Sequence, residues 1–303
     1  MNTPLTRVSI GAGLTAGTAA ILLGDLAIAD WAGMPVAPGF WGLLALALLK
    51  GGWEFFRMLR GRGLPCRPLI GMVFVLLVLA SVWLEVRRPG EILPWLYRRG
   101  LELYLLMIVG LVFTTFVVEI FVIERANRTP QEALASVGWT VLVVLTVGLL
   151  GVFLAKVRFL SANPVEGLMY LALTLGVVKA SDIGAYTVGT AIGRHRLVPK
   201  LSPKKTVEGL VGGIVMGTAM ALVIGLIWGR FTWPALLLFG SVVSISGVLG
   251  DLAESLMKRA CNVKDSGTIP TFGGALDILD SMLSAGPVAY VLLVVLTEPA
   301  TTP

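Results

Sequence analysis

Long apolar runs divide this 303-residue chain, and they constrain its fold more than any other feature. A transmembrane helix needs roughly 20 consecutive apolar residues to cross a hydrocarbon core about 30 Å thick. The runs, from which we expect about nine transmembrane helices, are Val8–Ala29, Gly39–Phe56, Pro68–Val86, Leu101–Ile123, Val137–Lys156, Glu166–Val188, Val207–Trp228, Pro234–Met257 and Leu276–Leu296. The sequence therefore predicts an all-α polytopic membrane protein.

The composition supports this prediction. Hydrophobic residues make up 56% of the chain and charged residues 14%, whereas a soluble domain is about a quarter charged. The segments between the runs are too short to hold a soluble domain, so we expect one integrated membrane domain. We interpret the net charge of +6 as a signal of topology and of affinity for phosphates, and we expect no nucleic-acid partner.

The lysine and arginine residues predict the orientation. With the N-terminus inside, the inside segments carry roughly twice as many of them as the outside segments, as the positive-inside rule requires. The loop from Arg87 to Arg99, with Arg88 and Arg98, runs against the rule. We therefore expect a cytoplasmic N-terminus, with the polar segments Arg194–Thr206 and Lys258–Leu276 both facing the cytoplasm.

The first run and the cysteines need separate interpretation. Arg7 and the small residues near Ala29 resemble a cleaved signal peptide, but Asp25 precedes the supposed cleavage site, so we expect a retained helix. Cys66 and Cys261 are the only cysteines. Both fall in segments assigned to the cytoplasm, where we expect reduced thiols and no zinc site.

Several ionisable residues lie inside the apolar runs, where a charge costs about 2.5–3.5 kcal/mol on insertion scales. Lys179 and Asp182 are three residues apart, which suits either function or a self-neutralising ion pair. Asp277 and Asp280 share one helix face, and Asp251 lies late in the preceding run. Carboxylates of this kind suit Mg²⁺, although an acidic helix N-terminus favoured by the helix dipole would also explain them.

The segment Arg194–Gly209 carries complementary charge. It contains five lysine and arginine residues, the single histidine, His195, and Thr206 directly before an apolar run. Free N–H groups at a helix N-terminus and neighbouring lysines bind phosphates, although basic loops also arise from topology alone. Gly209, Gly213 and Gly217 recur at every fourth position, and we interpret them as a helix-packing face. Cations for phosphate and carboxylates for a metal are the components of metal-assisted phosphoryl or nucleotidyl transfer.

Three motifs between Lys179 and Ser284 form a longer pattern. They are Asp182-x-x-Ala185-Tyr186-x-x-Gly189; Leu201-Ser202-Pro203-Lys204-Lys205-Thr206-x-Glu208-Gly209; and Ser255-Leu-Met-Lys258-Arg259 followed by Lys264-Asp265-x-Gly267, Ile269-Pro270, Gly273-Gly274, Asp277 and Asp280. This pattern resembles the signature of the phosphatidate cytidylyltransferases, also called CDP-diacylglycerol synthases. The N-terminal half is similar to that family only in hydropathy and in a Glu54-Phe55 pair.

The resemblance implies transfer of CMP from CTP to phosphatidic acid by metal-assisted in-line attack, with Mg²⁺ and an optional second metal ion. It implies residues 1–165 as scaffold, lipid-access or dimer helices and residues 166–303 as the catalytic helices, in a bacterial inner membrane with the active site facing the cytoplasm. The implied catalytic residues are Asp251, Asp277, Asp280, Lys258, Arg259, Lys264 and Asp265, of which the first three would hold the metal. The implied substrate-binding residues are Asp182, Tyr186, Ser202, Lys204, Lys205, Thr206, Ser255, Gly273 and Gly274.

Some positions depart from the family pattern. The family usually has His before the Gly-Gly pair and Arg after the first aspartate, where this chain has Phe272 and Ile278. Asp182 is followed by Ile183 in place of Ser or Thr. Because all the acidic positions remain, we favour an active enzyme over an inactive paralogue. Two different functions also fit a membrane chain with intramembrane charge: a CTP-dependent polyprenol or phytol kinase, and a membrane transporter, although the chain shows no repeat between its halves. A homodimer is compatible with the sequence.

Overall fold

The computed structural model describes residues 4–32, 37–87, 102–267 and 273–297, with only the backbone described for residues 4–15 and 32. Several residues named in the sequence analysis lie outside the described residues: Arg88, Arg98 and Arg99 of the expected outside loop, and Ile269, Pro270 and Phe272 of the third motif.

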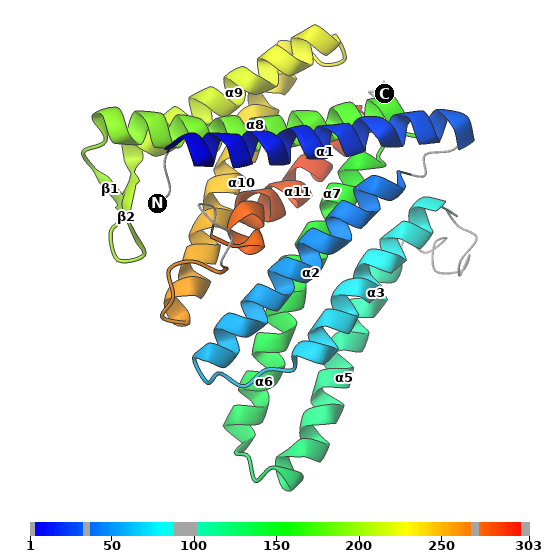
Figure 1. Ribbon diagram of the computed structural model, residues 1–303, viewed down its shortest axis with the longest axis vertical. Coiled ribbons are helices and arrows are strands. Elements are labelled where there is room, and N and C mark those ends of the chain that lie inside the picture. Colours follow the sequence, from blue (N-terminus) through cyan, green and yellow to red (C-terminus); the bar gives the residue numbers. More distant parts are fainter. Residues whose placement is uncertain (1–3, 33–36, 88–101, 268–272, 298–303) are drawn as a thin grey trace, which may run out of the picture. The chain divides into compact units, whose positions relative to one another are not determined.

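The described chain is almost entirely helical (Figure 1). In order, the elements are α1 (Pro4–Ala32), α2 (Pro38–Gly61), α3 (Pro68–Arg87), α5 (Leu103–Arg125), α6 (Pro130–Val143), η1 (Val144–Leu149), α7 (Leu150–Arg158), α8 (Pro164–Ile192), β1 (Arg196–Val198), β2 (Ser202–Thr206), α9 (Val207–Trp228), α10 (Trp233–Ala260) and α11 (Ala275–Thr297). Each predicted apolar run falls on a helix. The fifth run is divided among α6, the π-helical turn η1 and α7.

Seven helical segments of the described chain are long and apolar enough to cross a membrane. They are Pro68–Arg87, Leu103–Arg125, Pro130–Arg158, Pro164–Ile192, Val207–Trp228, Trp233–Ala260 and Ala275–Thr297. The prediction of an all-α membrane protein is therefore confirmed. That α1 and α2 also cross the membrane stays a prediction; α2 carries Lys50, Glu54 and Arg57 within its apolar length.

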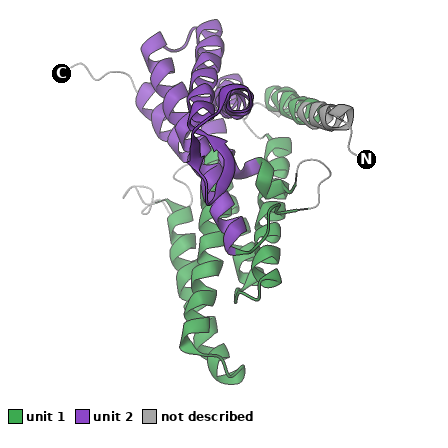
Figure 2. Ribbon diagram, turned by 90° about the vertical axis from the view of Figure 1, so that its left-hand side faces the viewer, with its two compact units in different colours: residues 1–155, 261–278 green, residues 156–260, 279–303 purple. Residues whose placement is uncertain are grey.

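The chain forms two compact units, coloured separately in Figure 2. The first unit consists of residues 1–155 and 261–278, and the second of residues 156–260 and 279–303. The division passes through α11, so that Asp277 belongs to the first unit and Asp280 to the second. The predicted functional division at residue 165 stays a prediction.

In the first unit, α2, α3, α5 and α6 lie alongside one another (Figure 1). Asp25 of α1 is 2% exposed and accepts hydrogen bonds from the backbone N–H groups of Gly39 (2.8 Å) and Phe40 (2.7 Å). The N-terminus of α2 has no cap from its own Ala37. Asp25 therefore supplies a cap from another helix, which explains a carboxylate inside the first apolar run.

A second buried carboxylate connects α5 with α6 and with the residue directly before α3 in the same unit. Glu119 of α5 is 2% exposed and accepts hydrogen bonds from Arg67 Nε (2.6 Å), Arg67 Nη2 (3.1 Å) and Ser136 Oγ (2.5 Å). The two bonds from Arg67 form a bidentate pair, the geometry in which a guanidinium best neutralises a carboxylate. This pair compensates the charge of Glu119 within a helix of membrane-spanning length.

In the second unit, α8 and α9 pack closely through the predicted glycine stripe. A Cβ atom at Gly209 would lie 2.8 Å from the Ala185 carbonyl oxygen, and one at Gly213 would lie 2.9 Å from the Ser181 carbonyl oxygen. Only glycine allows the two backbones to approach this closely. The interpretation of the stripe as a packing face is confirmed.

The basic segment between α8 and α9 is more ordered than the loop we expected from its sequence. β1 and β2 form an antiparallel hairpin in which Arg196 pairs with Thr206 and Val198 with Ser202. Thr206 then caps α9, because its Oγ1 atom accepts a hydrogen bond from the Gly209 N–H at 3.1 Å. Strand pairing was missed because its partners lie in a short segment rich in proline and lysine, which gives no alternating pattern.

Candidate functional site

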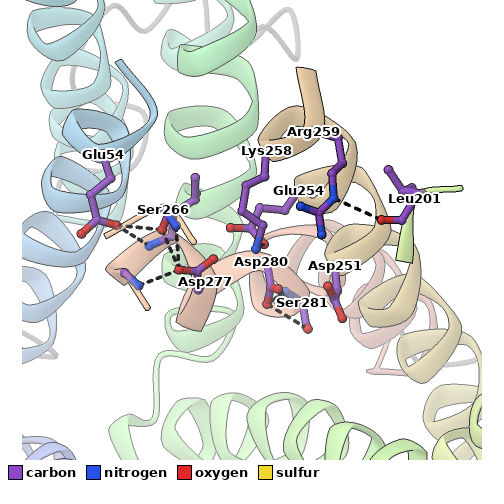
Figure 3. A network of polar contacts seen from close by, with 12 residues as sticks. Glu54, Leu201, Asp251, Glu254, Lys258, Arg259, Ser266, Asp277, Asp280 and Ser281 are labelled. Carbon is purple, nitrogen blue, oxygen red and sulfur yellow. Dashed lines mark hydrogen bonds and ion pairs between the residues drawn. The ribbon is translucent and has the colours of Figure 1, made fainter. Parts of the chain in front are cut away.

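Three carboxylates come together in the second unit (Figure 3). Asp251 and Glu254 lie one turn apart on α10, and Asp280 lies on α11. A carboxylate oxygen from each lies within 4.8 Å of those from the other two. Glu254 is buried and the two aspartates are half-buried, so their mutual repulsion is weakly screened by water and a compensating positive charge is required.

Two lysines supply part of that compensation. Lys205 Nζ of β2 lies 2.6 Å from Asp251 Oδ2, and Lys258 Nζ lies 2.8 Å from Glu254 Oε2. Lys205 reaches the carboxylates because the hairpin holds β2 in place. The Arg259 Nε atom donates a 3.4 Å hydrogen bond to the Leu201 carbonyl at the turn of the hairpin. The second unit thus combines acidic and basic residues of the second and third motifs.

Asp182 is connected to this cluster through a serine. The Ser281 Oγ atom lies 3.0 Å from Asp280 Oδ1 and 3.4 Å from Asp182 Oδ1. Lys179 donates to Asp182 Oδ2 at 3.2 Å, so the i, i+3 ion pair considered from the sequence is present. The Ser281 hydroxyl therefore bridges Asp182 and Asp280, and Lys179 neutralises the charge of Asp182.

The other residues predicted in the second unit differ in their surroundings. Tyr186 is 73% exposed on α8, Lys204 is exposed on β2, and Ser202 and Ser255 are half-buried. Thr206 is buried by its capping role. Of these, Thr206 caps α9 through its side chain and Ser202 pairs with Val198 in the hairpin.

In the first unit, Asp277 belongs to a different network (Figure 3). Its Oδ2 atom lies within hydrogen-bond distance of Ser266 N (3.0 Å), Ser266 Oγ (2.9 Å) and Gly274 N (2.6 Å). Glu54 of α2, 1% exposed, accepts at Oε2 from Leu276 N (3.0 Å) and Ser266 Oγ (3.2 Å). Asp277 is the third residue of α11 and binds the N–H preceding the helix, as a capping carboxylate does.

Close packing explains the glycines of the third motif. Gly273 has a φ angle of +82°, a conformation that side chains disfavour. A Cβ atom at Gly274 would overlap Ser266 Oγ and Glu54 Oε2, and one at Gly267 would lie 2.6 Å from Glu54 Oε1. Gly273 and Gly274, which we expected to bind substrate, therefore allow the chain to fold around buried carboxylates. Lys264 and Asp265 are exposed on the adjoining loop.

The cluster thus differs from the predicted metal-binding set in one member. Asp251 and Asp280 are brought together, with Glu254 as the third carboxylate, whereas Asp277 lies in the first unit with its Oδ2 atom engaged by backbone and hydroxyl donors. Glu254 was detectable from its i, i+3 spacing to Asp251 and its i, i+4 spacing to Lys258. The contact of Glu54 with Ser266 could not be predicted from sequence spacing, because the two residues lie 212 positions apart.

The comparisons with known proteins agree with one another. A family model described as "Cytidylyltransferase family" matches residues 16–296. A phosphatidate cytidylyltransferase of Mycobacterium leprae (strain TN) is 32% identical over 314 residues, which covers 97% of this chain and 91% of the relative. Proteins of the same name from Chlamydia pneumoniae and Bacillus subtilis (strain 168) are 31% and 33% identical, covering 72% and 52% of this chain and 70% and 58% of the relatives. These matches confirm the resemblance drawn from the three motifs.

Proposed function

This chain belongs to the cytidylyltransferase family, and on that basis we propose that it transfers CMP from CTP to phosphatidic acid. The products are CDP-diacylglycerol and pyrophosphate. The observation that carries the proposal is the cluster of Asp251, Glu254 and Asp280 with Lys205 and Lys258 in direct contact. The lysines of this cluster can bind the phosphate groups of the substrates, and its carboxylates can bind a metal cation.

The chemistry requires charge compensation more than proton transfer. The attacking group is a phosphate monoester whose second pKa is about 6, so it is largely ionised at neutral pH without a general base. The barrier arises because this anion must approach a triphosphate. Lys205 and Lys258, and the exposed Lys204 next to Lys205 in sequence, would bind phosphate oxygens as CTP enters.

The three carboxylates fit a divalent metal ion. Mg²⁺ prefers oxygen ligands and binds through a few carboxylates together with substrate phosphates, and Asp251, Glu254 and Asp280 offer oxygens within 4.8 Å of one another. When bound, the ion would screen the phosphate charges and favour departure of pyrophosphate. Ser281 orients Asp280 through its hydroxyl, while Asp277 and Glu54 position Ser266 and the start of α11.

The membrane arrangement is part of the same proposal. We propose about nine transmembrane helices, an N-terminus in the cytoplasm and a site facing the cytoplasm from a bacterial inner membrane. The distribution of lysine and arginine supports this orientation, and the relatives compared above are bacterial. Attachment of a membrane-impermeant thiol reagent to Cys66 in sealed inverted vesicles, but not in intact cells, would test it.

The decisive experiment follows the label of CTP. Purified protein in detergent receives phosphatidic acid, Mg²⁺ and CTP labelled at either the α- or the γ-phosphate. We expect α-label in lipid with the wild type, and losses in kcat of about 100-fold or more for Glu254→Gln and Asp280→Asn. Glu124→Gln, which changes an exposed carboxylate at the end of α5, serves as the control. Transfer of γ-label would instead identify a lipid kinase, and no transfer of either label would favour a transporter or an inactive paralogue.

A further inference from the structure

We propose that Arg57 and Arg62, at the end of α2, form a binding subsite for a phosphate group of one of the two substrates. This inference rests on the proposed function, because it assigns that reaction a phosphate contact outside the three motifs. The phosphate belongs either to the head of the lipid or to the triphosphate of CTP. Both sources offer the same chemistry to a guanidinium group.

The first observation is a cavity of about 360 Å³ within the first unit. Arg57 of α2 and Arg62, the residue directly after α2, line it on one side. The segment that follows α10 lines the other side through Cys261, Asn262, Asp265 and Ser266. Its volume is within the range of small-molecule sites, about 300–1,000 Å³.

The second observation is the charge of this lining. Arg57 Nη2 donates a 3.0 Å hydrogen bond to the Ser266 carbonyl, and a guanidinium carries five N–H donors, so further donors remain for a ligand. Among the described residues, no carboxylate forms an ion pair with Arg57 or Arg62. Asp265 is the single carboxylate among the lining residues, so the lining has a net positive charge and an anion would balance it.

The third observation is the place in the chain of the segment that lines the cavity, residues 261–266. The segment continues directly from α10, which carries Asp251 and Glu254, and leads to α11, which carries Asp280. Ser266, which accepts the bond from Arg57, also donates to Asp277. Arg57 therefore brings a guanidinium group from α2 to this segment.

A competing explanation is topological. Basic residues accumulate on cytoplasmic segments and near helix C-termini without binding any ligand. Arg60 provides the matched control, because it is exposed at the same end of α2 but lines a different cavity, with Cys66 and Arg128. A purely topological role would make Arg57, Arg60 and Arg62 equivalent.

Cys261 offers a direct readout of occupancy. It and Cys66 are the only cysteines, so Cys66→Ser leaves one thiol, in the wall of the cavity. The rate of labelling by an uncharged maleimide is measured with pyrophosphate, with CTP and with phosphatidic acid in mixed micelles. We expect one or more of these compounds to slow labelling in a saturable manner.

The arginine variants then assign the effect. In Arg57→Gln/Arg62→Gln the concentration giving half-protection should rise about tenfold or more, the usual loss for a charge-assisted hydrogen bond, while Arg60→Gln leaves it unchanged. Arg62→Gln alone should show part of the shift, and Arg57→Lys should restore part of it. Protection by CTP and pyrophosphate, with a raised KM for CTP, assigns the nucleotide phosphates. Protection by phosphatidic acid, with a raised KM for lipid, assigns the head group.

Two results would overturn the proposal: labelling of Cys261 that no compound slows, or protection that is equal in wild type and Arg57→Gln/Arg62→Gln. These results are distinct from failure of the proposed function. Protection without any CMP transfer by the wild type would refute the reaction and retain the subsite. CMP transfer by the wild type without protection of Cys261 would support the reaction and refute the subsite.

Discussion

The carboxylate of Glu54 provides the sharpest test of how the third motif is held. It lies on α2, is 1% exposed, and accepts hydrogen bonds from Leu276 N and Ser266 Oγ. Glu54→Ala removes both acceptors. The Ser266 hydroxyl can donate to Asp277 Oδ2 instead, at 2.9 Å, so the Leu276 N–H is the donor that loses its partner.

The expected magnitude follows from these contacts. A buried donor without an acceptor costs about 1–3 kcal/mol, and the space left beside Gly267 and Gly274 adds about 1 kcal/mol. We therefore predict that Glu54→Ala lowers the free energy of unfolding by about 2–4 kcal/mol. This corresponds to a fall of about 3–6 °C in the melting temperature for a chain of 303 residues. Glu54→Gln keeps the volume and one acceptor oxygen, and should lose less than about 1 kcal/mol.

The assay is the apparent melting temperature in detergent, followed by loss of the monodisperse peak in size-exclusion chromatography, together with the rate of CMP transfer at low temperature. Lys50→Met is the control, because Lys50 Nζ lies 3.9 Å from Glu54 Oε1 on a side chain that is 51% exposed, and exposed pairs contribute little. An unchanged melting temperature for Glu54→Ala would refute the reasoning. Equal losses for Glu54→Gln and Glu54→Ala would show that charge, and not the acceptor, matters.

Three further predictions concern other parts of the first unit. Gly274→Ala should lower the free energy of unfolding by about 1–3 kcal/mol, because its Cβ would overlap Ser266 Oγ and Glu54 Oε2, and both the melting temperature and the activity should fall. The control Gly42→Ala, where a Cβ meets nothing within 4 Å, should change neither. Glu119→Ala should cost about 3–5 kcal/mol by leaving its arginine partner unpaired in a largely buried site, and a melting temperature equal to that of the wild type would contradict this. Burial raises the pKa of the Cys261 thiol above the ordinary 9.0, so its alkylation should stay slow near neutral pH and accelerate only above that value as the thiolate forms. A labelling rate for Cys261 that has already reached its maximum near neutral pH would contradict the last prediction.

Local patterns in the sequence were sufficient for the helices and for the family. Hydropathy depends on consecutive residues, so each apolar run from Val8 to Leu296 could be placed on a helix without knowledge of its neighbours. The motifs around Lys205, Lys258 and Asp280 are likewise local, and the comparisons confirm the resemblance that they indicated. The glycine stripe from Gly209 to Gly217 was recognised for the same reason, since its spacing follows helical periodicity.

Only the tertiary structure decided which side chains meet. Asp251, Asp277 and Asp280 look equivalent in the sequence, yet packing brings Glu254 to the first and third of them while Asp277 binds the start of its own helix. The pairing of Glu54 with Ser266, across 212 residues, depends on how the chain returns to α2. A carboxylate's role is set by the donors and charges that surround it, and these come from segments whose distance in sequence carries no periodic signal.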